Sequence, residues 1–336
     1  MLIYGRSEDR HGVFSGGYII GSKIKFHALP GAILSLVFLL TLGDSNPGGP
    51  RPVSANPPPE PHADDSLIAH LDPRKLFLYS GAAVVVDDRE GRVLFEKNRL
   101  ARRPIASLTK LMTAMVVLDA ALPEEEVIAI TRADRDRLRG SKSKLSFGTE
   151  LTRLDLLKIS LAGSENRAAS ALARTYPGGG EALVAAMNEK ARALGMKDTV
   201  FRDAPGLHHE NLSTAADLAT LVEAAYRYPR IREFTTVGTD FVTDHRKGWK
   251  IRFVNTNRLV RNGRWNIHLS KTGYIADSGH CLVMRAEIAD RLVTVVLLNS
   301  WGEWSKYGDA NRIRKWLDHA DQKARETAQA AGKSAG

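Results

Sequence analysis

The sequence predicts an α+β fold in which strands from both ends of the folded region form one antiparallel sheet. Short apolar runs typical of strands lie early, at 82–86 and 92–95, and late, at 267–271, 281–288 and 292–298. Between these two groups, apolar residues recur at helical spacing. We therefore expect a mostly helical subdomain to cover the sheet.

The first half of the folded region supplies the hairpin and several of the helices. Gly91 ends the turn at 87–91 and predicts that the first two runs form a hairpin. A buried helix follows with Ser107 in its first turn, because apolar residues then repeat three and four positions apart. Residues 151–161 predict an amphipathic helix that ends at Gly163. Further helices follow, interrupted at Pro177 and the three glycines at 178–180.

The second half leads back to the sheet. Residues 213–217 resemble a capping box that begins the next helix, and Pro229 ends that helix. Residues 241–254 indicate mixed strand and turn. A tight turn at 289–291 joins the last two strands, and 310–317 predict a closing helix.

The two ends of the chain differ in composition from the middle. Residues 28–42 are uncharged and follow a basic region, which predicts that 1–43 is a secretory signal peptide or a retained signal anchor. Residues 44–66 are rich in proline and predict an extended linker. We expect the catalytic domain at 67–319 and a polar tail, helix or coil, at 320–336.

The charge balance favours an anionic partner. Lysine and arginine total 48 against 38 acidic residues, which gives a net charge of +10. Such a surface suits nucleic acid, phospholipid headgroups or an acidic wall polymer. The basic residues are scattered and no nucleic-acid-binding motif is present, so we expect no nucleic acid partner.

Redox and metal chemistry are not indicated. Cys281 is the single cysteine, so no internal disulfide can form, and its strand-like surroundings indicate a buried structural thiol. The ten histidines form no His-Glu-x-x-His or Cys/His cluster. We therefore expect neither a metal nor a cofactor.

The pattern Ser-x-x-Lys occurs three times, at Ser22/Lys25, Ser107/Lys110 and Ser141/Lys144. The first precedes the apolar N-terminal segment, and the third lies in a basic, hydroxyl-rich run that predicts a solvated loop. Only Ser107 begins an apolar-periodic helix. Residues three apart share a helix face, so the Lys110 amine can reach the Ser107 hydroxyl and remove its proton.

Two further motifs follow in order, Ser164-Glu165-Asn166 and Lys271-Thr272-Gly273. Ser164 follows the glycine that ends a helix, from where it could pass a proton to a leaving amine, and Asn166 could bind a substrate amide. The third motif is expected at the end of a strand. Lys271 would lower the pKa of Lys110 and attract a carboxylate, and Gly273 would let a substrate backbone approach closely. Together they indicate acyl transfer through a serine ester.

This ordered set resembles the serine D-alanyl-D-alanine peptidases, the low-molecular-mass penicillin-binding proteins, over about residues 75–318. The context is most similar to the penicillin-binding-protein-seven type endopeptidases at 161–169, 176–179, 193–199 and 255–260.

The resemblance implies a role for each motif residue. Ser107 would be the nucleophile, Lys110 its base, and Ser164 a further catalytic hydroxyl. Lys271 would bind substrate, and the oxyanion would be held by the N–H groups of Ser107 and Tyr274. With these, the residues expected to bind substrate are Asn166, Lys271, Thr272, Gly273 and Tyr274.

The implied substrate is peptidoglycan, whose D-Ala–diaminopimelate cross-links would be cleaved in the periplasm. Penicillins and other β-lactams would be covalent inhibitors, and a retained N-terminal segment would associate the protein with the inner membrane. Two departures favour cross-link cleavage over trimming. Glu165 stands where carboxypeptidase relatives carry glycine, and 299–304 lack the arginine that clamps a terminal carboxylate in those relatives.

Three other readings remain open from the sequence. A D-alanyl-D-alanine carboxypeptidase would share the fold and the motifs. A β-lactamase is less favoured, because 201–205 offer no deacylating glutamate. A noncatalytic wall-binding protein would not need all three motifs. A Ser-His-Asp hydrolase is excluded, because no Gly-x-Ser-x-Gly elbow occurs.

Overall fold

The computed structural model describes residues 65–334. The signal or anchor predicted at 1–43, and nearly all of the linker predicted at 44–66, lie outside this part of the chain. Within the described part, no helix is both long and apolar enough to span a membrane.

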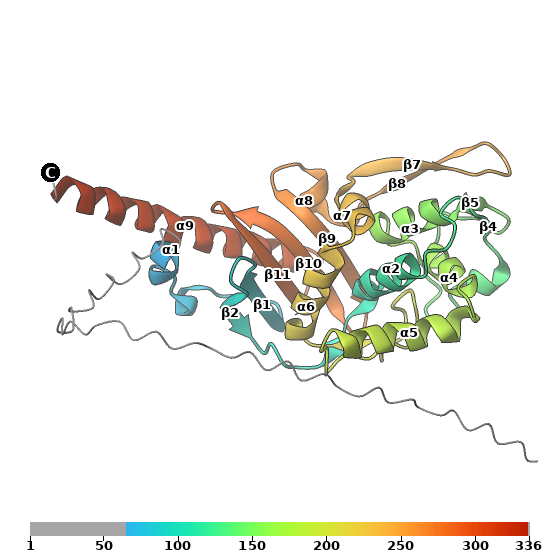
Figure 1. The fold of residues 1–336 in the computed structure, drawn as a ribbon, viewed down its shortest axis with the longest axis horizontal. Coiled ribbons are helices and arrows are strands. Elements are labelled where there is room, and N and C mark those ends of the chain that lie inside the picture. The colour runs from blue at the N-terminus through green and yellow to red at the C-terminus, as the bar shows by residue number, and fades with distance from the viewer. Residues whose placement is uncertain (1–64, 335–336) are drawn as a thin grey trace, which may run out of the picture. The chain divides into compact units, whose positions relative to one another are not determined.

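A five-stranded antiparallel sheet forms the centre of the fold, as the sequence predicted (Figure 1). The spatial order is β2-β1-β11-β10-β9, so the early hairpin joins the late strands where β1 pairs with β11. The strands are β1 (Ala82–Asp87), β2 (Arg92–Lys97), β9 (Asn266–Ile275), β10 (Gly279–Ile288) and β11 (Arg291–Ser300).

The sheet is buried on both faces, and its side chains alternate between two cores. Val84 and Val296 face a core shared with the helical region, whereas Val85 and Val295 face a core shared with the C-terminal helix. Cys281 lies in the first of these cores, where burial raises the pKa of its thiol to about 11. It is therefore a structural thiol, as predicted.

The helical region lies between β2 and β9 in the sequence and carries two of the three motifs (Figure 1). The α-helices of this region are α2 (Thr109–Asp119), α3 (Arg153–Ala162), α4 (Asn166–Arg174), α5 (Gly179–Ala193), α6 (Ala215–Tyr226), α7 (Pro229–Thr236) and α8 (Arg258–Arg261). Its short strand pairs are β3 (Arg103–Pro104) with β6 (Leu212–Ser213), β4 (Val127–Ala129) with β5 (Glu150–Thr152), and β7 (Thr239–Thr243) with β8 (Lys250–Val254).

Several predicted elements differ in extent or character. The helix predicted at 151–161 is α3, which is buried on most of its surface rather than amphipathic. Helix α7, which Pro229 begins, was not predicted. The third motif does not end a strand, because β9 continues to Ile275 and holds Lys271 to Tyr274 in its interior. The closing helix, α9 (Ser305–Ser334), extends far beyond 310–317, so the described part of the tail is helical.

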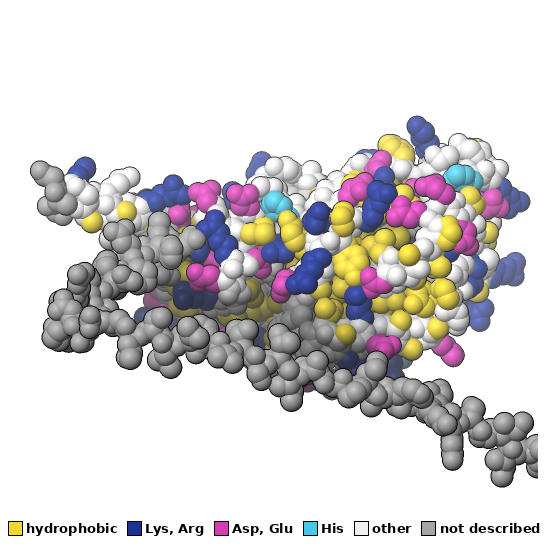
Figure 2. Space-filling model, in the orientation of Figure 1, with side chains coloured by type: hydrophobic (Ala, Val, Ile, Leu, Met, Phe, Trp, Pro, Cys, Tyr) yellow, Lys and Arg dark blue, Asp and Glu magenta, His cyan; other side chains and the backbone are white. Residues whose placement is uncertain are grey.

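The surface is mixed in charge. Figure 2 shows basic and acidic side chains interspersed over the face it presents.

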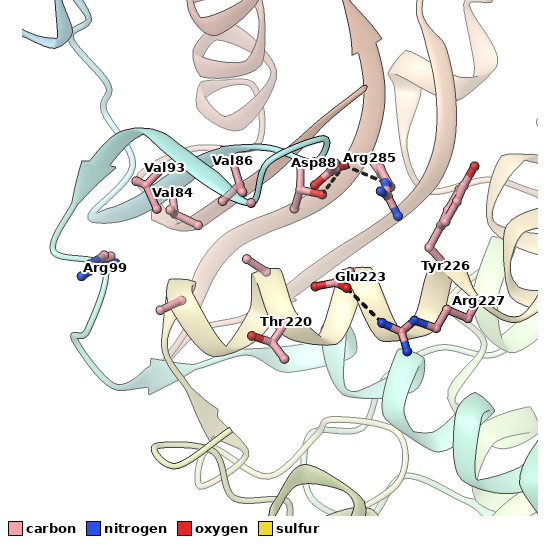
Figure 3. Close-up of a pocket in the computed structure, with 14 residues that line it drawn as sticks. Val84, Val86, Asp88, Val93, Arg99, Thr220, Glu223, Tyr226, Arg227 and Arg285 are labelled. Atoms are coloured by element: carbon pink, nitrogen blue, oxygen red, sulfur yellow. Dashed lines mark hydrogen bonds and ion pairs between the residues drawn. The ribbon is translucent and has the colours of Figure 1, made fainter. Parts of the chain in front are cut away.

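A cavity of about 460 Å³ opens between the sheet and α6 (Figure 3). Asp88 pairs with Arg285 on its sheet side and Glu223 with Arg227 on α6. None of the predicted site residues lines this cavity.

Asp309 anchors α9 to the segment that precedes β1. Its buried carboxylate accepts hydrogen bonds from the backbone N–H groups of Tyr79 and Ser80, at 3.0 and 2.7 Å, and from the Ser80 hydroxyl at 2.6 Å. The Arg312 guanidinium also forms an ion pair with this carboxylate, with 2.9 Å between Nη1 and Oδ1. Removing the carboxylate would leave buried donors without an acceptor.

We therefore expect Asp309→Ala to lower the free energy of unfolding by about 2–4 kcal/mol, measured by urea titration. Asp318→Ala on the same helix is the matched control, since Asp318 is exposed and forms a long ion pair with Arg314 at 3.7 Å. That control should cost less than about 0.5 kcal/mol. Equal losses in the two variants would contradict this account of Asp309.

Candidate active site

The turn that carries Ser107 is held between two glycines. Ser107 lies in a 3₁₀ turn, η2 (Ala106–Leu108), that leads directly into α2. A Cβ atom on Gly273 would lie 2.9 Å from the Ile105 carbonyl oxygen and 3.1 Å from the Ser107 nitrogen. At Gly206, where φ is +79°, a Cβ atom would overlap the Ala106 carbonyl. Gly273 is thus required by the close packing of β9 against the nucleophile's own turn. The expectation that it also lets a substrate backbone approach closely stays a prediction.

Lys110 is fully buried beneath Ser107. Its amine donates to the Ser107 hydroxyl at 2.9 Å, the Asn166 side-chain oxygen at 2.7 Å and the Pro205 carbonyl at 2.6 Å. Burial lowers the pKa of Lys110 to about 7, against the opposing attraction of Asp203 and other nearby carboxylates. A large fraction of this amine is therefore neutral at neutral pH.

The hydrogen bonds of the neutral Lys110 amine orient its lone pair toward Ser107. A neutral amine has two N–H donors and one lone pair, whereas the ammonium has three donors. The Asn166 oxygen and the Pro205 carbonyl can only accept hydrogen bonds, so they take the two remaining N–H groups. The lone pair is then left for Ser107, whose hydroxyl proton it can receive.

Ser164 and Lys271 form a second serine–lysine pair. Ser164 lies between α3 and α4, directly after Gly163, which caps the C-terminus of α3. Its φ of +56° is a left-handed conformation. The Lys271 amine donates to the Ser164 hydroxyl at 2.9 Å and to the Thr272 carbonyl at 2.9 Å. Lys271 is buried, and both burial and the nearby Lys110 hold its pKa well below the usual range.

This arrangement changes one expectation about Lys271. The sequence predicted that Lys271 would depress the pKa of Lys110, but burial is the main cause of that shift. In addition to burial, the nearby Lys110 amine also lowers the pKa of Lys271. Because the Lys271 amine contacts Ser164, its position fixes the orientation of that hydroxyl.

Asn166 connects the first two motifs to a loop that the sequence analysis set aside. Its oxygen accepts from Lys110, and its side-chain nitrogen donates to the Ser141 hydroxyl at 2.8 Å. Ser141 belongs to the Ser-x-x-Lys match that was interpreted as a solvated loop. The loop is a wall of the site instead, and no local signal in the sequence distinguished it.

Asp203 is a further residue that the sequence analysis missed. Its carboxylate accepts from the backbone N–H groups of Gly206 at 2.6 Å and His208 at 2.7 Å. These bonds hold the turn that presents the Pro205 carbonyl to Lys110. The signal available was Asp-x-Pro-Gly, since aspartate before such residues commonly caps a turn.

The remaining predicted residues follow along β9. The Thr272 hydroxyl bonds to that of Thr256 at 2.7 Å. Tyr274 is 59 % exposed, and its ring stacks on His280 with centroids 4.3 Å apart. Near this end of the strand, Arg139 forms an ion pair with Asp277 at 2.7 Å and so joins the Ser141 loop to the β9–β10 turn.

The geometry agrees with comparisons to known proteins. Residues 72–301 match the profile of the D-alanyl-D-alanine carboxypeptidase family. A D-alanyl-D-alanine endopeptidase of Pseudomonas aeruginosa is 44% identical over 266 residues, covering 79% of this chain and 83% of the relative. One of Escherichia coli is 42% identical over 239 residues, covering 71% and 77%.

A solved structure is similar in fold. A penicillin-binding protein of Listeria monocytogenes, in a cefotaxime-bound form, superposes with a TM-score of 0.63 at 28% identity. The match covers 72% of this chain and 98% of that one. The protein described here therefore belongs to the D-alanyl-D-alanine carboxypeptidase family of serine peptidases.

Proposed function

We propose that this protein is a D-alanyl-D-alanine endopeptidase that hydrolyses D-Ala–diaminopimelate cross-links of peptidoglycan through a serine acyl-enzyme. The observation that carries the proposal is the buried Lys110 amine, with a pKa of about 7, in contact with Ser107. The names of the two relatives described above support cleavage of cross-links rather than trimming.

The reaction assigns one task to each motif. Ser107 attacks the carbonyl carbon of the D-alanine, and Lys110 takes the hydroxyl proton. The backbone N–H groups of Ser107 and Tyr274 stabilise the oxyanion. Ser164, held by Lys271, gives its hydroxyl proton to the nitrogen that leaves as the C–N bond breaks, and the proton that Lys110 took from Ser107 passes to Ser164, so that both Lys110 and Ser164 return to their starting states. Water then hydrolyses the serine ester.

A carboxypeptidase is the second candidate, favoured by a Bacillus subtilis relative of that name at 32% identity. Digestion of purified cross-linked muropeptide dimers separates the two. Conversion of dimers to monomers supports the endopeptidase, whereas release of free D-alanine from pentapeptide monomers with dimers intact supports the carboxypeptidase. If a folded protein forms neither product, the result supports a noncatalytic wall-binding protein.

Location and inhibitors follow from the same proposal. Peptidoglycan lies outside the inner membrane, so the domain would act in the periplasm after export directed by residues 1–43. Whether that segment remains as an inner-membrane anchor is tested by detergent extraction of the full chain.

The family's penicillin-binding fold and the cefotaxime-bound relative support acylation of Ser107 by β-lactams.

We expect Ser107→Ala to abolish both dimer cleavage and covalent labelling by fluorescent penicillin, because among the described residues no other hydroxyl forms a hydrogen bond with the Lys110 amine. Ser146→Ala removes an exposed serine near the site and is the matched control, with activity unchanged. Penicillin labelling that persisted in the Ser107→Ala variant would reject this nucleophile.

The rate of acylation should depend on the pH through Lys110. Below its pKa of about 7 the amine is protonated and cannot act as a base, so the rate should fall about tenfold per pH unit. Above that value the rate should level. Lys110→Arg keeps the positive charge but stays protonated, so acylation should drop about 10²–10⁴-fold. A flat profile between pH 5 and 9 would contradict the assignment.

A further inference from the structure

A second cavity, of about 270 Å³, opens directly beside Ser164. We call it the Ser164 pocket. Three segments form it: the loop after Ser141, the α3–α4 junction, and strand β8. Its lining residues are Lys142, Ser143, Lys144, Leu145, Ile159, Gly163, Ser164, Glu165, Ile251, Phe253 and Val254.

The floor of the Ser164 pocket is apolar and its rim is basic. Leu145, Ile159 and Phe253 are buried beneath it. Lys142 and Lys144 are exposed at the rim, and within the described residues neither amine has an acidic partner in ion-pair range. Lys144 makes one long contact, with the Arg252 carbonyl at 3.4 Å. The rim therefore offers two cations to a ligand.

The wall that carries these lysines is fixed in place. Glu165 accepts from the backbone N–H of Lys144 at 3.3 Å and from that of Arg167 at 3.2 Å. Arg167 in turn donates to the Leu145 carbonyl at 2.5 Å. Glu165 is thus a positioning residue, because its carboxylate binds backbone N–H groups of the loop and of α4 rather than the amines of Lys142 and Lys144. Glycine at this position, as in the carboxypeptidase relatives, could not hold the loop.

The pocket lies on the side of the leaving group. Ser164 gives the proton to the departing nitrogen in the proposed reaction, and the same residue lines the pocket. Whatever is attached to that nitrogen therefore meets the pocket first.

We propose that the Ser164 pocket binds the leaving stem peptide of a cross-link, and this rests on the endopeptidase function proposed above. The methylene chain of the diamino acid lies on the apolar floor. Free carboxylates of the same stem pair with Lys142 and Lys144. A single D-alanine, the leaving group of a carboxypeptidase, has one methyl group and no second carboxylate for these sites, so the pocket acts in cross-link cleavage alone.

The test combines a charge change on the protein with one on the substrate. Lys142→Met with Lys144→Met keeps most of each side chain's length and removes both charges. We expect kcat/KM for muropeptide dimers to fall about tenfold, while acylation by penicillin is unchanged. The second substrate is the same dimer with the carboxylates of its leaving stem amidated. For the wild type, kcat/KM should be about tenfold lower with this amidated dimer than with the unmodified dimer. For the double variant, amidation should lower kcat/KM little further.

The matched control is Lys197→Met with Lys333→Met, which removes the same net charge at exposed positions away from the pocket. It should cleave both dimers as wild type does. Equal dimer cleavage by wild type and the Lys142/Lys144 variant would overturn the pocket proposal. Wild type that is acylated by penicillin but leaves every dimer intact would instead overturn the endopeptidase proposal, so the two failures are distinct.

Discussion

The burial of the Lys110 amine is the constraint on which the rest of the site depends. A lysine with no exposed surface is stable only when its donors are paired and its charge can be given up. Here its partners come from three separate parts of the chain: Ser107 in the 3₁₀ turn that precedes α2, Asn166 on α4, and the Pro205 carbonyl. The fold therefore cannot assemble this amine without also assembling the acyl-transfer site.

Close backbone packing supplies the geometry that the chemistry needs. The Ser107 turn is pressed between β9 and the 203–208 turn, and glycine is the one residue that fits at both contacts. The sheet fixes β9 through its ladder with β10, and Asp203 fixes the opposite turn. The nucleophile is consequently held by two rigid elements rather than by its own helix alone, which reduces the reorganisation needed for reaction.

The two serine–lysine pairs divide the work by position. Lys110 contacts Ser107, the proposed nucleophile, and Lys271 contacts Ser164, the proposed donor of a proton to the leaving group. Beside Ser164 the site includes a pocket with a basic rim. If the pocket binds as we propose, it gives a physical reason why one member of a family named for trimming single residues can accommodate a branched leaving group.

The sequence by itself determined the sheet-forming segments, the principal helices and the three motifs, because these depend on local periodicity and on side chains close in the chain. Ser107 with Lys110 could be recognised for the same reason, being one helical turn apart. The Ser141 loop and the role of Glu165 could not, since each acts on a residue or a backbone group brought near by folding. Asp203 had a local turn signal, but its link to Lys110 through the Pro205 carbonyl is also made only by folding. The pKa of Lys110 likewise belongs to the tertiary structure, because it is set by the exclusion of water, which no local pattern records.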